Sequence, residues 1–360
     1  MKYQILFLLT LVSSFLLAQD NQVENDSISE NIETPFIEEH LQQLNISFEV
    51  SNERTNFEVP YEGENFFVKS NLNIRYAFVF SYKFFSIRLG IRPPISDLEE
   101  QNKGKTKLFR LRVKLLFDKW SHNIEYLRNE GYYIGNSSNI NIEEVNEDFH
   151  IQFPSLVTNI IQGNSFYKIN DNYSVRAVES QTEIQLKSAG TFMPGIDYKY
   201  YNLKGADEVK ISPNEIIFRD NYNELNGFVV GINAGYYYTF VLHKYLFANL
   251  YVNTGGSIDF YKSTNYESGN AIDNTNNAFL FSFKSRISAG YNGKKIFAGL
   301  GYDYSYSSEK FNENNTQIQP SKDQFNIYIG YRFKAPKQLR KPVEKIEEIV
   351  PILKKDKKIN

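Results

Sequence analysis

Apolar and polar residues alternate along much of this chain with a period of two. In one segment, Phe109, Leu111 and Val113 alternate with Arg110 and Arg112. This period predicts strands with one wet face, because a helical period of 3.6 would scatter the charges around the axis. The alternation is strong in segments 44–50, 71–80, 85–92, 109–117, 224–242, 245–262, 276–292, 295–308 and 322–334, and weaker in 120–134 and 152–168.

The lengths of these segments and of their connections favour a membrane barrel over a soluble sandwich. Several segments exceed ten residues, whereas ordinary strands have about 5–6. Short connections near 81–83, 118–119, 168–172, 242–244 and 292–294 alternate with long ones at 52–65, 93–104, 135–151, 203–223, 263–275 and 309–321. Short periplasmic turns and long outer loops are typical of outer-membrane barrels. We predict an all-β fold, a single antiparallel transmembrane β-barrel.

The polar stretch 172–202 fixes the expected strand count. It must cross the membrane once. A second crossing would place the preceding long connections in the periplasm and the preceding short turns outside. One crossing gives an even total of about 12 strands. A crossing uses only about 9–11 residues, so we expect the surplus, 178–188, to form a lumenal insert. The polar residues of this stretch are Arg176, Glu179, Gln181, Glu183, Gln185 and Lys187.

The two ends of the chain have compositions unlike the barrel. Residues 1–18 combine Lys2, an apolar core and Ala18, which predicts a secretory signal peptide. Residues 19–41 are predicted to be a disordered acidic periplasmic leader, 42–334 the barrel, and 335–360 a basic, solvated periplasmic tail.

Overall composition narrows the class of protein. Aromatic residues make up 16% of the chain, hydrophobic residues only 41%, and mean hydropathy is −0.45, which excludes a helical membrane protein. The chain has no cysteine, so disulfides, thiolate metal sites and a lipoprotein anchor are excluded. A formal net charge of −2 argues against a nucleic-acid partner.

Basic residues share one predicted face of neighbouring early strands. One interpretation is that these charges are simply solvated in a water-filled lumen. A more specific interpretation is a basic lumenal wall that pairs with acidic groups of the insert. Glu179 and Glu183 are the expected acidic groups, with Arg110 and Arg112 as their expected partners. The wall residues are Arg75, Arg88, Arg92, Arg110, Arg112 and Lys114.

No set of residues indicates catalysis. The four histidines do not converge with a serine and an acid, as nucleophilic catalysis requires. Residues Glu143, Glu144, Glu147 and Asp148 lack the spacing of a calcium loop, which favours a solvated acidic loop. We therefore predict no catalytic, cofactor-binding or metal-binding residues, no cofactor and no enzymatic activity.

Five short motifs resemble one protein family. They are PSL at 154–156, GNSFYKIN at 163–170, YSVRA at 173–177, QTEIQLKSAGT at 181–191 and GYRF at 330–333. The chain resembles, over most of its mature length, the family called domain of unknown function 4421, found mostly in Bacteroidota. The resemblance implies an outer-membrane barrel and supplies no reaction, ligand or catalytic residue.

Three functions remain open on the sequence. The first is a partly plugged channel or transporter for small solutes or apolar molecules in the cell outer membrane. The second is a structural or interaction barrel with a closed lumen and surface-binding loops, and the third is an outer-membrane enzyme. The expected partners are outer-membrane lipid, lipopolysaccharide and the barrel assembly machinery, with no nucleic acid. The sequence leaves the cargo open.

Overall fold

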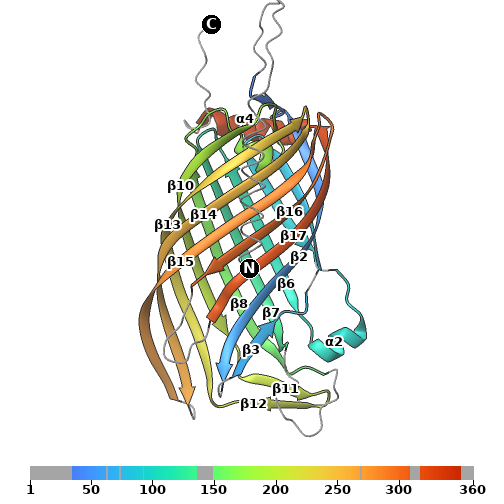
Figure 1. Cartoon of the computed structure of the whole chain (residues 1–360). Coiled ribbons are helices and arrows are strands. Elements are labelled where there is room, and N and C mark those ends of the chain that lie inside the picture. Colours follow the sequence, from blue (N-terminus) through green and yellow to red (C-terminus); the bar gives the residue numbers. More distant parts are fainter. Residues whose placement is uncertain are drawn as a thin grey trace, which may run out of the picture. The chain divides into compact units, whose positions relative to one another are not determined.

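Twelve antiparallel strands close into a barrel in the computed structural model of the protein (Figure 1). The structure describes residues 35–61, 64–72, 74–91, 93–135, 149–267, 270–308 and 317–349. The predicted all-β barrel of about 12 strands is confirmed. The barrel strands are β2 (Gln43–Tyr61), β4 (Ile74–Tyr82), β5 (Phe85–Ile91), β6 (Lys107–Leu116), β7 (Trp120–Ile134), β8 (Gln152–Tyr167), β10 (Ala189–Lys204), β13 (Tyr222–His243), β14 (Leu246–Glu267), β15 (Asn270–Asn292), β16 (Ile296–Ser307) and β17 (Gln317–Lys334).

Two strands far apart in the sequence close the ring. The last strand, β17, pairs antiparallel with the first, β2, with Phe325 opposite Asn52. Strands β7 and β8 join the two halves, with Glu125 opposite Gln162. Closure satisfies the backbone hydrogen-bonding groups of every barrel strand, which is the condition for strands to lie in lipid.

The outer surface of the barrel carries an apolar belt. In β17, exposed Phe325 and Ile327 flank the polar, half-buried Asn326, so the alternation of the sequence separates an outer from an inner face. Ile232 on the outer face of β13 is 74% exposed. Every barrel strand contributes at least one exposed large hydrophobic residue, among them Val50, Phe78, Leu89, Phe109, Ile124, Ile161, Ile196, Ile232, Ile258, Ile287, Leu300 and Ile327.

The short turns gather at one end of the barrel, at the top of Figure 1. Lys83 and Lys244 take positive φ values of 51° and 30° in two of these turns. The opposite end carries the added elements β3 (Glu64–Lys69), α2 (Asp97–Lys103), β11 (Glu208–Ser212) and β12 (Glu215–Phe218) (Figure 1). We call these the turn end and the loop end.

Several predicted long loops are largely strand. Strands β13, β14 and β15 run for 22, 22 and 23 residues, about twice the length that one crossing needs. Their pairing continues past the crossing, so the predicted loops 203–223 and 263–275 begin or end inside strands. The same holds for 52–65, most of which belongs to β2 and β3. Residues 136–148 and 309–316 lie outside the described part of the chain.

Both terminal segments contain ordered elements that the sequence did not predict. Strand β1 (Ile37–Glu39) pairs with β9 (Glu183–Gln185), so part of the leader predicted at 19–41 belongs to the fold. Residues 1–34 and 350–360 lie outside the described residues. The tail contains helix α4 (Lys337–Ile349), which the prediction of a solvated tail missed.

Helix α4 packs against the turn end of the barrel. Val343 is 5% exposed and contacts a cluster that includes Tyr82, Phe84 and Ala335. Lys83 adds an ion pair to Glu347 at 2.5 Å. Leu339, four residues before Val343 on the same helix face, packs against the same cluster, whereas Ile346 and Ile349 remain exposed. None of the helices in the described ranges has the length and the apolar character needed to cross a membrane.

Candidate functional site

The lumenal insert leaves the barrel between β8 and β10. Asn170 closes its base on the start of β10, donating from Nδ2 to the Gly190 carbonyl at 2.8 Å. Helix α3 (Val175–Glu179) follows, and the hydroxyl of its N-cap Ser174 accepts from the Ala177 amide at 2.8 Å. Such capping satisfies an amide that the first turn of a helix leaves unpaired. The observed insert therefore starts before residue 178, where the sequence placed it.

The strand of the insert is tied to the barrel through its backbone. Asn292 donates to the Glu183 carbonyl at 3.0 Å, and Arg332 donates to the Gln181 carbonyl at 2.6 Å. Between these points Thr182 and Ile184 are 0% and 1% exposed. Because these bonds use main-chain acceptors, they fix the position of β9 independently of its side chains.

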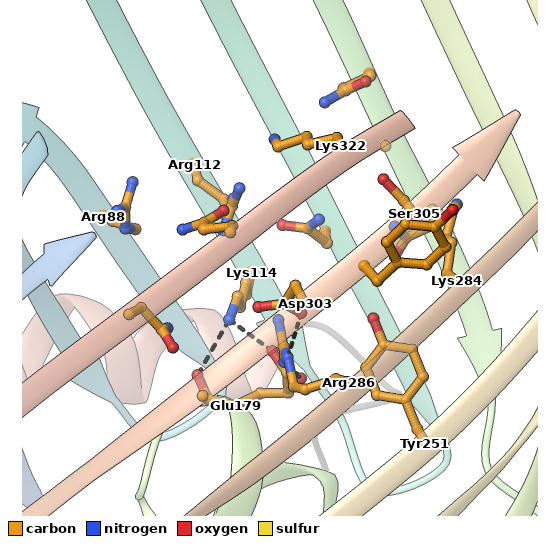
Figure 2. A pocket seen from close by; sticks show the side chains of 18 of the residues that line it. Arg88, Arg112, Lys114, Glu179, Tyr251, Lys284, Arg286, Asp303, Ser305 and Lys322 are labelled. Carbon is orange, nitrogen blue, oxygen red and sulfur yellow. Dashed lines mark hydrogen bonds and ion pairs between the residues drawn. The ribbon is translucent and has the colours of Figure 1, made fainter. Parts of the chain in front are cut away.

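Glu179, the last residue of α3, reaches the barrel wall. Its carboxylate contacts Lys114 Nζ at 2.6 Å and Arg286 Nη1 at 2.9 Å, and Arg286 also contacts Asp303 at 2.5 Å (Figure 2). We call Glu179, Lys114, Arg286 and Asp303 the latch. Each of these side chains is 20–24% exposed, so the latch lies where the insert meets the open part of the lumen.

The predicted partners of the insert carboxylates were wrong. Glu179 binds Lys114, which lies two residues nearer the turn end of β6 than Arg112, because the insert enters from that end. Glu183 turns back into the insert and accepts from Arg176 and Ser174, at 2.8 and 2.6 Å. The buried Arg176 also donates to the Leu116 carbonyl at 2.8 Å, which anchors α3 to the wall.

The remaining insert residues have local roles. Gln181 takes a positive φ of 52° and donates to the Val178 carbonyl at 2.8 Å. Gln185 is buried and donates to the Asn172 carbonyl at 2.7 Å. Lys187 lies 5.1 Å from the ring centroid of Phe36, just before β1. These contacts stabilise the fold of the insert without reaching the predicted wall.

The predicted wall residues lie inside the barrel and bind carboxylates on the wall itself. Arg88 makes a two-point contact with Glu49, at 3.1 and 2.9 Å. Arg112 contacts Glu125 at 2.6 Å. Arg75 and Arg110 share Glu53, at 2.7 and 2.6 Å, and Lys114 belongs to the latch. Arg92 lies outside the described residues.

The wall carboxylates that bind these basic residues, Glu49, Glu53 and Glu125, were not identified from the sequence. Glu49 and Glu53 have the same parity in β2 as buried Ser47 and Ser51. The alternation in β2 therefore places both carboxylates in the lumen.

A cavity of about 420 Å³ fills the middle of the lumen. Its lining includes Val178 and Glu179 of the insert and extends to Tyr306 and Ser307 at the loop-end terminus of β16. Charged residues from several strands point into this space, among them Arg88, Arg112, Lys284 and Lys322 (Figure 2). The cavity therefore connects the insert to the level at which β16 ends.

Both charged and apolar residues line the cavity. Val229 and Leu280 line it and belong to a buried inner cluster with Ile160, Tyr201 and Tyr261. Charged residues line it from both halves of the barrel, on β2, β5, β6 and β17 and also on β10, β15 and β16. The lumen thus offers charged groups on both sides, and an apolar patch at Val229 and Leu280, to any molecule inside it.

The latch should resist acid. Burial acts to raise the pKa of Glu179, but Lys114 and Arg286 outweigh it and lower the pKa from 4.5 to about 2. The stabilisation given by a carboxylate with a lowered pKa is present above its ordinary pKa and is lost as pH falls through the lowered value. Conductance through the lumen is therefore expected to stay constant from neutral pH to about pH 5 and to rise gradually as pH falls from there toward 2. Recordings in planar bilayers would check this, and a midpoint of opening near 4.5 would contradict it.

Two further clusters could suggest chemistry. His122 Nδ1 lies 2.7 Å from Ser165 Oγ, but Trp120 stacks on the imidazole with ring centroids 6.1 Å apart. This group also includes Tyr167 and resembles an aromatic anchor at a membrane interface. No group of three residues suited to hold a metal ion occurs in the described ranges. The acidic residues at 143, 144, 147 and 148 lie outside those ranges.

Together these features define the outer-membrane class of β-barrel fold. The barrel is closed, its outer face is apolar, its turns are short at one end, and its hairpins are long at the other. The chain belongs to the family described as domain of unknown function (DUF4421), whose model matches residues 25–333. This match confirms the family resemblance of the sequence motifs.

Comparison with other proteins adds fold likeness only. Among curated proteins, none matches the chain. The outer-membrane protease OmpT from Escherichia coli is 9% identical with a TM-score of 0.36, and the match covers 83% of this chain and 98% of OmpT. The translocator domain of autotransporter NalP from Neisseria meningitidis is 8% identical with a TM-score of 0.36, covering 82% and 89%. A deltaS2 mutant of the TodX monoaromatic hydrocarbon channel is 9% identical with a TM-score of 0.35, covering 85% and 92%.

Proposed function

We propose that this protein is an outer-membrane channel for small solutes whose lumen is gated by the insert. The apolar belt on all twelve strands supports residence in a lipid bilayer, because exposing that belt to water would cost a large free energy. Bacterial barrels with short turns at one end place those turns in the periplasm. The insert, β1 and α4 would then lie at the periplasmic end of the barrel. Its lipid partners would be outer-membrane lipid and lipopolysaccharide, and its insertion would use the barrel assembly machinery.

One observation carries the channel proposal. A single cavity touches both the insert, at Glu179, and the loop-end terminus of β16, at Ser307. The lumen is therefore occupied by the insert at the turn end and hollow from there to the level of Ser307. Polar and charged groups line most of the hollow part, which suits water and small polar solutes. We propose no enzymatic activity, because the Ser165–His122 contact lies in an aromatic group with Trp120 and Tyr167 and not among the residues that line the cavity.

A closed structural or interaction barrel is the second candidate, and the base of the insert favours it. Thr182 and Ile184 are fully buried, and Asn292 and Arg332 hold the backbone beside them. An insert fixed in this way could be permanent. The two candidates differ in whether α3 and the latch can move while β9 stays in place.

Replacing Glu179 by Gln tests the channel. Glutamine keeps the size of the side chain but removes the charge that attracts Lys114 and Arg286. Partly exposed ion pairs contribute about 1 kcal/mol, so the open probability in planar bilayers is expected to rise about fivefold. The wild-type protein should show rare openings under the same conditions.

Asp197→Asn is the matched control. Asp197 contacts Lys284 at 3.1 Å across the lumen and is as partly exposed as the latch, but it does not touch the insert. Its loss should leave the open probability unchanged. If wild-type protein and Glu179→Gln both remain closed while folding normally, the lumen is shut and the interaction barrel is the better description.

A further inference from the structure

A second set of charges, separate from the latch, lies deeper in the lumen. Its centre is Glu53 on β2, whose side chain is 3% exposed. Three cations reach this one carboxylate: Arg110 at 2.6 Å, Arg75 at 2.7 Å and Lys322 at 2.9 Å. They come from β6, β4 and β17, so the set spans the seam at which the barrel closes.

The set continues through a second carboxylate. Glu125 on β7 contacts Arg112 at 2.6 Å and Arg110 at 3.4 Å. Gln162 donates to its other oxygen at 2.9 Å. We call Arg75, Arg110, Arg112, Lys322, Glu53 and Glu125 the central cluster. Among the described residues, its ion pairs join four cations to two carboxylates, which leaves two positive charges in excess.

Neighbouring ion pairs do not remove this excess. Arg88 is matched by Glu49, and Lys284 is matched by Asp197. In the latch, two cations face two carboxylates. Each of these sets is electrically balanced, whereas the central cluster is not. Like charges held together away from bulk water are costly unless an opposite charge joins them.

Two cations of the central cluster face the cavity. Arg75 and Arg110 are buried, and Arg75 Nε has no hydrogen-bond partner among the described residues. The side chains of Arg112 and Lys322 are 20% and 23% exposed, and both line the cavity. Figure 2 shows both residues at the same side of that space. Arg112 and Lys322 are thus the two members that a solute in the cavity can reach.

We propose that Arg112 and Lys322 bind the anionic group of a solute in the lumen, a carboxylate or a phosphate. An arginine and a lysine side by side can contact two oxygens of one oxyanion. The bound anion would offset the excess charge that Glu53 and Glu125 leave. As a statement about cargo this rests on the proposed channel, but the site itself can be measured without a membrane.

The apolar residues Val229 and Leu280 allow two possible sources of the anionic group. A free oxyanion such as phosphate would use only Arg112 and Lys322. An amphiphile would also place its chain against Val229 and Leu280. Both share the same anionic chemistry, so the probes must separate them.

Isothermal titration of the purified full-length mature barrel in detergent tests the site. The probes are inorganic phosphate, acetate and hexanoate at constant ionic strength, with tetramethylammonium as a cationic probe. The anions should bind and tetramethylammonium should not. Lys322→Gln should weaken anion binding about fivefold, and Lys322→Arg should restore it. Tighter binding of hexanoate than of acetate would identify an amphiphile, and tightest binding of phosphate would identify a free oxyanion.

Lys284→Gln is the matched control, since Lys284 lines the same cavity but is balanced by Asp197. It should change anion affinity less than about twofold. The proposal is overturned if no anion binds, if tetramethylammonium binds equally well, or if Lys284→Gln and Lys322→Gln have equal effects. The titration does not require conduction. A barrel that never opens in bilayers would therefore refute the channel proposal but not the anion site.

Discussion

Replacing residues 174–187 by a short Gly-Ser turn should leave a folded barrel that conducts at least about tenfold more than the wild type. A tenfold change requires removal of only about 1.4 kcal/mol of closed-state stability. The strand ladder does not depend on the insert, because β8 and β10 pair directly from Phe166 opposite Gly195 onward. The deletion removes α3, β9 and Glu179 together, so the cavity would open toward the turn end. Planar bilayer recordings and the thermal unfolding midpoint would measure both parts of this expectation.

The control replaces helix α2 by the same linker. Asp97–Lys103 is a helix at the loop end with no buried residue, although its backbone accepts hydrogen bonds from Asn71, His150 and Gln152. Its removal should therefore lower stability modestly while leaving conductance unchanged. A deletion of the insert that folds but conducts no more than the parent would show that the insert is not the gate. In that case the second candidate, a closed interaction barrel, would replace the channel.

Glu53→Ala should destabilise the barrel strongly, by about 3–5 kcal/mol. This substitution leaves Arg75, Arg110 and Lys322 without the carboxylate that they share. Removing one partner of a buried ion pair exposes the other charges to their full desolvation cost. Unfolding by guanidinium, followed by tryptophan fluorescence from Trp120, would measure the loss.

Glu49→Ala is the comparison for this prediction. Among the described residues, the ion pair of Glu49 is with Arg88, so its loss leaves one cation without its partner rather than three around one site. Its effect should be clearly smaller than that of Glu53→Ala. Adding Lys322→Met to Glu53→Ala should recover part of the stability, because it removes one of the repelling charges. Equal losses for Glu49→Ala and Glu53→Ala would contradict the central role of Glu53.

The barrel could be predicted from the sequence because its signal is periodic. Alternation such as Phe325, Asn326 and Ile327 indicates which side chains face outward, and a closed ring is the only way for such strands to lie in lipid. Strand ends were less predictable, since pairing in β14 and β15 continues past the membrane. Helix α4 was underestimated because its spacing shows an apolar stripe but not the turn against which Val343 packs.

The interior was only partly predictable. The sequence identified Glu179 as a contact between insert and wall, but its partner depends on how far the insert penetrates. Arg286, the second partner, lies 107 positions away in the chain, and nothing local in the sequence connects the two. The excess charge of the central cluster required knowing that Arg75, Arg110 and Lys322 converge on one carboxylate, which only strand register determines.

The pairing of β1 with β9 has a mechanical consequence. Ile37, Glu38 and Glu39 lie opposite residues of the insert, and the His40 amide adds a bond to the Thr182 carbonyl at 2.9 Å. The chain reaches the first barrel strand, at Gln43, only after this small sheet. Tension applied to the chain ahead of β1 would therefore act on the insert before it acted on the barrel. The order of segments along the backbone makes β1 a tether between the first barrel strand and the element that occupies the lumen.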